Sequence, residues 1–98
     1  LSSKWWKNVT YTLKEEYGEN YDRFLINLKP FAIRKKNKDI VLSSPSKFIR
    51  DWVRREFIEK SYLSNSKRTL KDIILSIKSE EFSFISEVEE VIVVFIDG

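Results

Sequence analysis

The 98-residue sequence predicts a small α/β domain of the α+β class, in which helices pack mainly on one face of a three-stranded sheet. Three observations support this prediction. Apolar residues recur with helical spacing before residue 29 and again between residues 46 and 78. Two short apolar stretches lie between these regions and flank a polar turn. A third, β-branched run covers residues 91–96, so the expected order of elements is α-α-β-β-α-α-β.

The first helix is predicted over residues 4–17 and a second, short helix over residues 19–28. Gly18 separates them, at a position where a residue with left-handed backbone angles commonly ends a helix. Pro30 ends the second helix, because proline disfavours helical angles at the residue before it. The predicted apolar faces are Trp6, Val9, Leu13 and Tyr17 in the first helix, and Tyr21, Phe24, Leu25 and Leu28 in the second.

Two strands are predicted next, one around Phe31 and Ile33 and the other over residues 40–42. Residues 35–39 form a polar turn between them, so the two strands should pair as an antiparallel hairpin. A hairpin alone is marginally stable in water, and the run at residues 91–96 is expected to complete the sheet. Its nearly continuous apolar character predicts a central or well-covered position.

The third helix is predicted over about residues 46–61 and the fourth over residues 67–78. Ser44 or Ser46 can cap the third helix, and Pro45 fits at or near its first turn. Residues 62–66 form a break, and the sequence favours no element over residues 79–90. The expected apolar faces are Phe48, Ile49, Trp52, Val53 and Phe57 in the third helix, and Leu70, Ile73, Ile74 and Ile77 in the fourth.

The composition excludes several kinds of active site. Without Cys or His, these 98 residues cannot form a disulfide, a thiolate nucleophile, a Cys/His zinc site or a Ser-His-Asp triad. The sequence also contains neither a phosphate-binding glycine loop nor a G-x-S-x-G motif. No apolar run is long enough to cross a membrane, and no signal-peptide core is present. We therefore expect a cytoplasmic binding module without cofactor or metal, and not an enzyme.

The charge distribution is uneven along the chain. Residues 1–77 carry 17 Lys and Arg against 9 Asp and Glu, whereas residues 78–98 carry 1 against 6, giving a net charge of +3. A basic body of this kind can attract phosphates or an acidic partner. The alternative is a solvated surface with an acidic end that has no binding role.

Residues 44–54 read S-P-S-K-F-I-R-D-W-V-R, which is similar to the pattern A-P-N-x-F-x-x-D-W-V. That pattern opens the third helix of the N-terminal domain, domain I, of the bacterial replication initiator DnaA. Residues 6–13 and 21–28 resemble the first and second helices of the same family. The sequence departs from the family where Phe24 replaces a tryptophan, and residues 63–89 are longer than usual.

The resemblance implies a KH-like fold over residues 1–98 that works as a docking hub. In the family, this domain self-associates, binds the replicative helicase DnaB, receives regulators of initiation and binds single-stranded DNA weakly. Trp6, with its neighbour Trp5, matches the self-association tryptophan. Phe48 matches a phenylalanine that contacts the helicase. Asn20 stands where the family has a glutamate in that contact, and Tyr21 is the aromatic residue after it.

Other interpretations of the same residues remain open. Both tryptophans could pack at the edge of the core, and Phe48 could be buried beside Trp52, which is itself expected in the core. A rival function is a single-stranded nucleic-acid-binding module, although the family and this chain lack the G-x-x-G clamp of KH domains. A third is a free-standing regulator that titrates the initiator or the helicase. The candidate phosphate contacts are Lys47, Arg50 and Arg54, joined with Lys35, Lys36 and Lys38 into one basic element.

Overall fold

The computed structural model describes residues 3–55, 69–77 and 87–96 of the chain. Within these ranges the order of elements agrees with the predicted α+β pattern. The predicted break at residues 62–66, the end of the third helix with Phe57, and residues 79–86 lie outside the described residues. The elements are α1 (Ser3–Tyr17), α2 (Glu19–Arg23), the 3-10 turn η1 (Leu25–Asn27), β1 (Lys29–Arg34), β2 (Asp39–Ser44), α3 (Lys47–Val53), α4 (Leu70–Ser76) and β3 (Glu90–Phe95).

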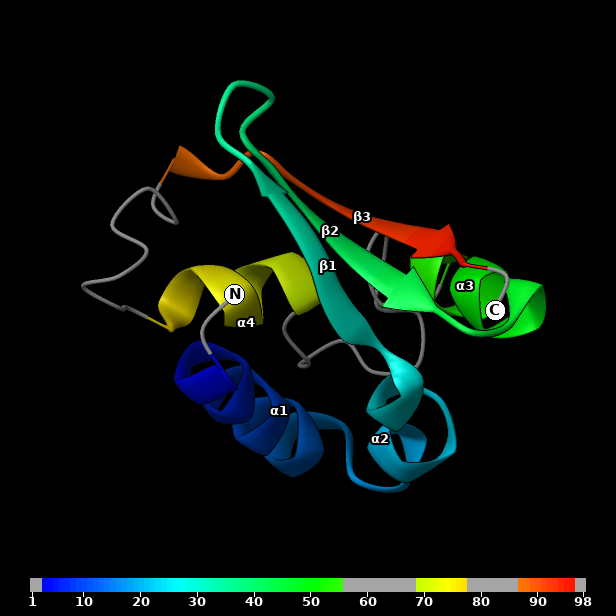
Figure 1. The fold of residues 1–98 in the computed structure, drawn as a ribbon. Coiled ribbons are helices and arrows are strands. Elements are labelled where there is room, and N and C mark those ends of the chain that lie inside the picture. Colours follow the sequence, from blue (N-terminus) through cyan, green and yellow to red (C-terminus); the bar gives the residue numbers. More distant parts are fainter. Residues whose placement is uncertain (1–2, 56–68, 78–86, 97–98) are drawn as a thin grey trace.

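The three strands form one mixed sheet in the order β1-β2-β3. β1 pairs antiparallel with β2 across the predicted hairpin, and β3 pairs in parallel with β2. Figure 1 shows α1 and α4 on one side of the sheet, with α3 beside the ends of β2 and β3. The predicted sheet, with its helices mainly on one face, is therefore confirmed.

The central strand of the sheet is β2, and not the last strand as one of our two interpretations had it. Five of the six residues of β2 are buried, and Ile40 and Leu42 belong to the main core. β3 lies at the sheet edge, where only Val91 and Val93 are fully buried under the helices. A continuous apolar run indicates that a strand is covered, but it does not reveal how many partners the strand has.

The core-facing side of α1 differs from the predicted one at its first residue. Trp5 is only 1% exposed and leads a buried stripe that continues through Val9, Leu13 and Tyr17 at a constant spacing of four. Trp6 is half-buried and packs against the edge of this core. The structure therefore buries Trp5, and not Trp6 as the predicted apolar face had it.

The ends of the helices follow from local chemistry. Gly18 has a φ of 55°, so α1 ends in the left-handed region that glycine adopts without strain, as predicted. The predicted second helix is divided, because α2 ends at Arg23 and a 3-10 turn follows it. Ser46 caps α3, since its Oγ accepts the Ile49 N–H at 3.3 Å. Thr69 and Asp72 cap α4 reciprocally through two hydrogen bonds of 3.1 and 3.3 Å.

The hairpin between β1 and β2 is held by an ion pair that depends on the register of the two strands. Arg34 lies opposite Asp39, and its guanidinium donates two hydrogen bonds of 2.8 and 2.6 Å to the buried carboxylate. This two-bond geometry raises the pKa of Arg34 above its usual value.

Among the described helices, none combines the length and apolar character needed to cross a bilayer.

We expect truncation of the central strand to destabilise the fold strongly. Leu42→Ala removes a fully buried side chain between the sheet and the helices, and should lower the free energy of unfolding by about 2–5 kcal/mol. Tyr11→Ala, at a side chain that is 67% exposed on α1, should change it by less than about 0.5 kcal/mol. Urea unfolding followed by circular dichroism measures both, and equal midpoints for the two variants would contradict this core.

Candidate protein-docking surface

Three aromatic side chains connect the end of α2 to α3, and we call them the aromatic cluster: Phe24, Phe48 and Trp52. The ring of Phe24 stacks on Trp52 with centroids 3.8 Å apart and planes 23° apart. Phe48 lies 6.4 Å from Phe24 in a tilted arrangement. Such pairs stabilise by about 0.5–1.5 kcal/mol beyond the area they bury, so the cluster fixes α2 against α3.

Phe48 is the exposed member of the cluster, with 67% of its surface accessible. The Ser46 cap sets where α3 begins, and Ile49 and Val53 then face the core. Phe48 therefore lies on the outer side of the first turn. This finding corrects the interpretation that Phe48 is buried in the same apolar face as Trp52. A large exposed aromatic side chain beside two others is typical of an interaction site.

Trp52 is half-buried, because it packs against the edge of the core and is covered by Phe24 on its outer side. The expectation that Trp52 lies in the core was therefore only partly correct. Phe24 was not among the site residues predicted from the sequence. The available signal was its position in the second-helix segment, where it replaces the tryptophan of the resembling family.

Asn20 and Tyr21 lie on α2, one turn before Phe24, and both are half-buried. The carbonyl of Asn20 accepts the N–H of Phe24 at 3.0 Å. Tyr21 packs against the core and lines a shallow hollow toward α1, together with Tyr11. The structure thus brings the predicted residues of α2 and Phe48 onto neighbouring elements. Phe24 directly follows α2, and its ring lies 6.4 Å from the ring of Phe48.

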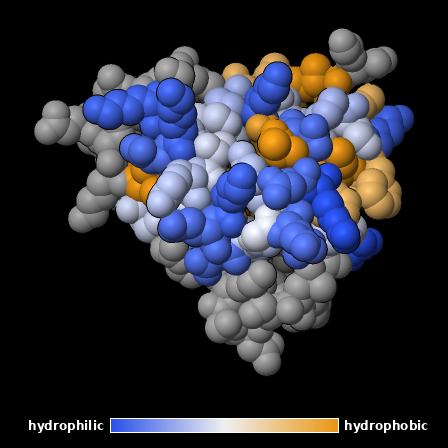
Figure 2. Space-filling view, turned by 90° about the horizontal axis from the view of Figure 1, so that it is seen from below, coloured by the Kyte–Doolittle hydropathy of each residue, from blue (hydrophilic) through white to orange (hydrophobic). Residues whose placement is uncertain are grey.

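Ile26 in η1 extends the apolar surface beyond the cluster. It is exposed and lines two hollows, one between α1 and α2 and the other at the lower end of the sheet. The second hollow has a volume of about 270 Å³ and is also lined by Pro45 and Ile96. Figure 2 shows most of the hydrophobic colour on the half of this face that carries α2 and α3, with hydrophilic residues around it. The apolar surface here thus consists of several patches with hydrophilic residues between and around them.

The pair Trp5 and Trp6 does not form a common surface. Their ring centroids are 5.7 Å apart, but Trp5 is enclosed in the core, so it cannot contact another molecule while the core is intact. Trp6 retains accessible surface on α1. Of the two residues predicted for self-association, only Trp6 is placed to make such a contact.

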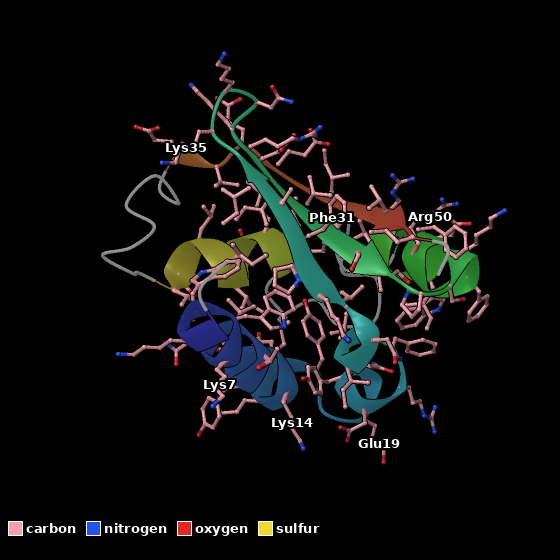
Figure 3. All side chains as sticks on the ribbon, in the orientation of Figure 1. Lys7, Lys14, Glu19, Phe31, Lys35 and Arg50 are labelled. Atoms are coloured by element: carbon pink, nitrogen blue, oxygen red, sulfur yellow. The ribbon has the colours of Figure 1, made fainter. Side chains whose placement is uncertain are left out.

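The six predicted phosphate contacts do not form one basic element. Lys35, Lys36 and Lys38 lie in the hairpin turn, and Lys47, Arg50 and Arg54 lie in or just after α3. The six residues of β2 separate the two groups by about 20 Å at the usual rise of a strand. Figure 3 shows Lys35 and Arg50 at opposite ends of the sheet. The prediction of a single basic face is therefore wrong.

Several of these cations already have partners within the chain. The Arg50 Nε donates to Asp51 Oδ1 at 2.8 Å, the Lys38 Nζ lies 3.6 Å from a carboxylate oxygen of Glu89, and the Lys47 Nζ lies 5.5 Å from the centre of the Phe95 ring. No three acidic residues in the described part of the chain gather into a set that could hold a metal ion.

Comparison with known proteins agrees with the resemblance of residues 44–54 to the family motif. The family model described as the DnaA N-terminal domain matches residues 3–64. The chromosomal replication initiator protein DnaA of Wolbachia sp. subsp. Brugia malayi (strain TRS) is 28% identical over 81 residues. The matched region covers 80% of this chain and 17% of that protein, so the chain spans a small part of its relative. No solved structure matches the chain significantly.

The cluster predicts different stability effects for its two phenylalanines. Phe24→Ala removes the stacking on Trp52 and should lower the free energy of unfolding by about 1–3 kcal/mol. Phe48→Ala removes a mostly exposed side chain and should cost less than about 0.5 kcal/mol. Thermal and urea unfolding measure the difference. A larger loss from Phe48→Ala than from Phe24→Ala would mean that Phe48 is a core residue.

The Arg50–Asp51 pair predicts a titration shift. The hydrogen bond from Arg50, followed by the positive charges of Arg54 and Arg55, holds the pKa of the Asp51 carboxyl below its usual value. The pairing therefore stabilises the fold above the unfolded-state pKa, and this small contribution is lost as pH falls through the folded-state pKa. An NMR pH titration of the carboxyl should show an upward shift of the pKa in Arg50→Gln, and an unchanged midpoint would exclude the pairing in solution.

Proposed function

Because the chain belongs to the DnaA N-terminal domain family, we propose that it is a protein–protein docking module of DNA replication initiation. In this proposal, one surface holds the replicative helicase DnaB or a regulator of initiation, and another brings copies of the module together. The family match and the DnaA relative support the setting in replication initiation. The particular partners are part of the proposal and are taken from the family resemblance.

The observation that carries the proposal is the exposure of Phe48 on a capped helix, next to the stacked pair of Phe24 and Trp52. Water contact with a large apolar ring is unfavourable, and a partner that covers Phe48 would remove it. The stacked pair holds the helix that carries Phe48, so less order has to be gained on binding than at a free loop. This combination of a rigid support and an exposed aromatic side chain is suited to reversible docking.

Asn20 and Tyr21 would complete this docking surface from α2. The amide of Asn20 can both donate and accept a hydrogen bond, whereas the glutamate of the family can only accept one when ionised. The contact here would therefore be neutral, and weaker than a charge-assisted one. We expect a helicase contact that depends more on Phe48 than on electrostatic attraction at Asn20.

Self-association would use Trp6, the member of the tryptophan pair with accessible surface on α1. A half-buried indole offers a limited contact area, so the interaction of two isolated modules should be weak. Copies arranged side by side on one DNA molecule would have a high effective concentration, and weak contacts would then be sufficient. The same surfaces would also serve a free-standing regulator that binds the initiator or the helicase.

Binding of single-stranded nucleic acid is the second candidate function. Lys47, Arg50 and Arg54 lie on or beside the helix that presents Phe48, so cations for phosphates and an aromatic ring for base stacking occur together. The separation of the hairpin lysines from this group leaves a short basic surface. A binding constant that falls steeply with salt concentration would support this candidate.

Titration of the isotope-labelled chain with the N-terminal domain of DnaB tests the docking proposal. We expect saturable NMR shifts at Asn20, Tyr21 and Phe48, and a loss of affinity of about tenfold or more in Phe48→Ala. Phe31→Ala is a matched control, because Phe31 is similarly exposed at 58% but lies on β1 outside the aromatic cluster. Its affinity should equal that of the unaltered chain.

A parallel titration with a single-stranded oligonucleotide at physiological salt separates the two candidates. Shifts confined to Lys47, Arg50 and Arg54 with the oligonucleotide, together with none from DnaB, would replace the docking proposal by the nucleic-acid one.

A further inference from the structure

The start of β1 and the end of β2 meet beside η1 and form the second of the two hollows described above, which we call the sheet-end hollow. Figure 1 shows this end of the sheet between α2 and α3. Three separate parts of the chain line the hollow, through residues that include Ile26, Asn27, Lys29, Ser43, Pro45 and Ile96. No member of the aromatic cluster lines it, so a molecule in the hollow need not contact Phe48.

The register of the sheet brings three of these side chains onto one face. Lys29 lies opposite Ser43, and Ser43 lies opposite Val94 in β3. The N–H of Ile96 donates to the carbonyl of Ser44 at 3.0 Å, so the strand pairing continues past the end of β3. Because side chains alternate along a strand, Ile96 shares the face of Val94. The three side chains therefore lie on the face of the sheet that is turned away from α1 and α4.

The wall of the hollow is apolar and accessible to solvent. Ile26 is 51% exposed and Ile96 is 37% exposed, and they are two of the five exposed large apolar side chains of the described residues. Pro45 adds a third apolar group. The hydroxyl of Ser44 holds the turn around this proline, since it donates to the Ser46 carbonyl at 2.9 Å and accepts the Ser46 N–H at 3.3 Å. A wall held in this way gains little further order when an apolar group covers it.

The size of the hollow limits what it can hold. Its volume of about 270 Å³ is smaller than the roughly 300–1,000 Å³ of pockets that enclose drug-sized ligands. In protein interfaces, single bulky side chains of one partner commonly fill small pockets of the other. The hollow therefore fits one anchoring side chain of a peptide better than a cofactor.

Lys29 gives the hollow a positive charge. It is the one charged residue among the lining side chains, and the four ion pairs within the described part of the chain do not include it. The amide of Asn27 adds hydrogen-bond donors to the same lining. A carboxylate complements these groups, because it carries the opposite charge and accepts hydrogen bonds from both.

We propose that the sheet-end hollow binds an acidic peptide segment of a partner protein. A bulky apolar side chain of the segment would lie between Ile26, Pro45 and Ile96. A carboxylate next to it in the segment would pair with Lys29. The hollow would be a second docking site, additional to the proposed surface around Phe48. One anchor and one exposed ion pair give a weak contact, with a dissociation constant on the order of 1 mM for the isolated segment.

A short synthetic peptide with one phenylalanine between two aspartates is the probe for this site. When it is titrated into the isotope-labelled chain, saturable NMR shifts should appear at Ile26, Lys29 and Ile96. Two matched peptides are the controls. Alanine in place of the phenylalanine should abolish the shifts. Lysines in place of the aspartates should weaken binding by about fivefold or more, and this difference should decrease as the salt concentration rises.

Substitutions in the chain locate the binding site. Lys29→Glu should weaken binding of the acidic peptide by about fivefold and strengthen binding of the lysine peptide. Lys36→Glu, at an exposed lysine of the hairpin turn, should change neither at physiological salt. Ile96→Ala should weaken both peptides, whereas Phe48→Ala should bind the acidic peptide as the unaltered chain does. Circular dichroism confirms that each variant is folded.

Two kinds of result would overturn the proposal. Shifts confined to the surroundings of Phe48, with none at Ile96, would assign the peptide to the aromatic cluster. Equal binding of the three peptides, or binding that is unchanged by both Lys29→Glu and Ile96→Ala, would show that the hollow is not the site. DnaB is absent from these titrations, so a failure here is separate from a failure of the proposed helicase contact.

Discussion

The position of β2 between an antiparallel and a parallel neighbour is the constraint on which the rest of this structure depends. An antiparallel neighbour can be reached by a tight turn, and the lysine-rich hairpin supplies it. A parallel neighbour requires the chain to return to the starting end of the sheet, and the segment that contains α3 and α4 makes this crossover. Because α3 begins directly after β2 and is capped by Ser46, Phe48 lies in the first turn of this helix. The position of the exposed Phe48 ring thus depends on where the central strand ends.

Support for this surface comes from the first part of the chain. α1 contributes the buried stripe from Trp5 to Tyr17, and α2 and η1 then turn back toward the sheet. Phe24 lies at that turn and stacks on Trp52, so two segments that are distant in sequence meet at one aromatic contact. A docking surface made from a loop alone would lose conformational entropy on binding. Here, the packed core and the stacked rings hold Phe24 and Trp52 in place, as the proposed docking role would require.

Much of this architecture could be predicted from the sequence, because helices and hairpins depend on local patterns. The extent of α1, the hairpin, a serine cap at Ser44 or Ser46 and the last strand all followed from spacing and turn chemistry, and the structure selects Ser46 for the cap. The errors occurred where two arrangements satisfy the same pattern. Trp5 and Trp6 both continue an apolar stripe toward Val9, and only packing against the sheet selects Trp5. The Arg34–Asp39 pair depends on strand register, which composition does not reveal.

The order of the strands also determines where some of the acidic and basic residues lie relative to each other. Among the described acidic residues of this part of the chain, Glu89 lies at the hairpin end of the sheet, where it pairs with Lys38 and its carbonyl accepts the Lys71 ammonium at 2.6 Å. Glu89 therefore offsets a lysine of the hairpin, while the cations of α3 lie at the other end of β2. Lys47 and Arg54 are exposed in or just after α3, the helix that carries Phe48. Because an exposed aromatic ring attracts apolar groups and nearby cations attract acidic ones, the partner in the proposed docking role would be acidic and partly apolar.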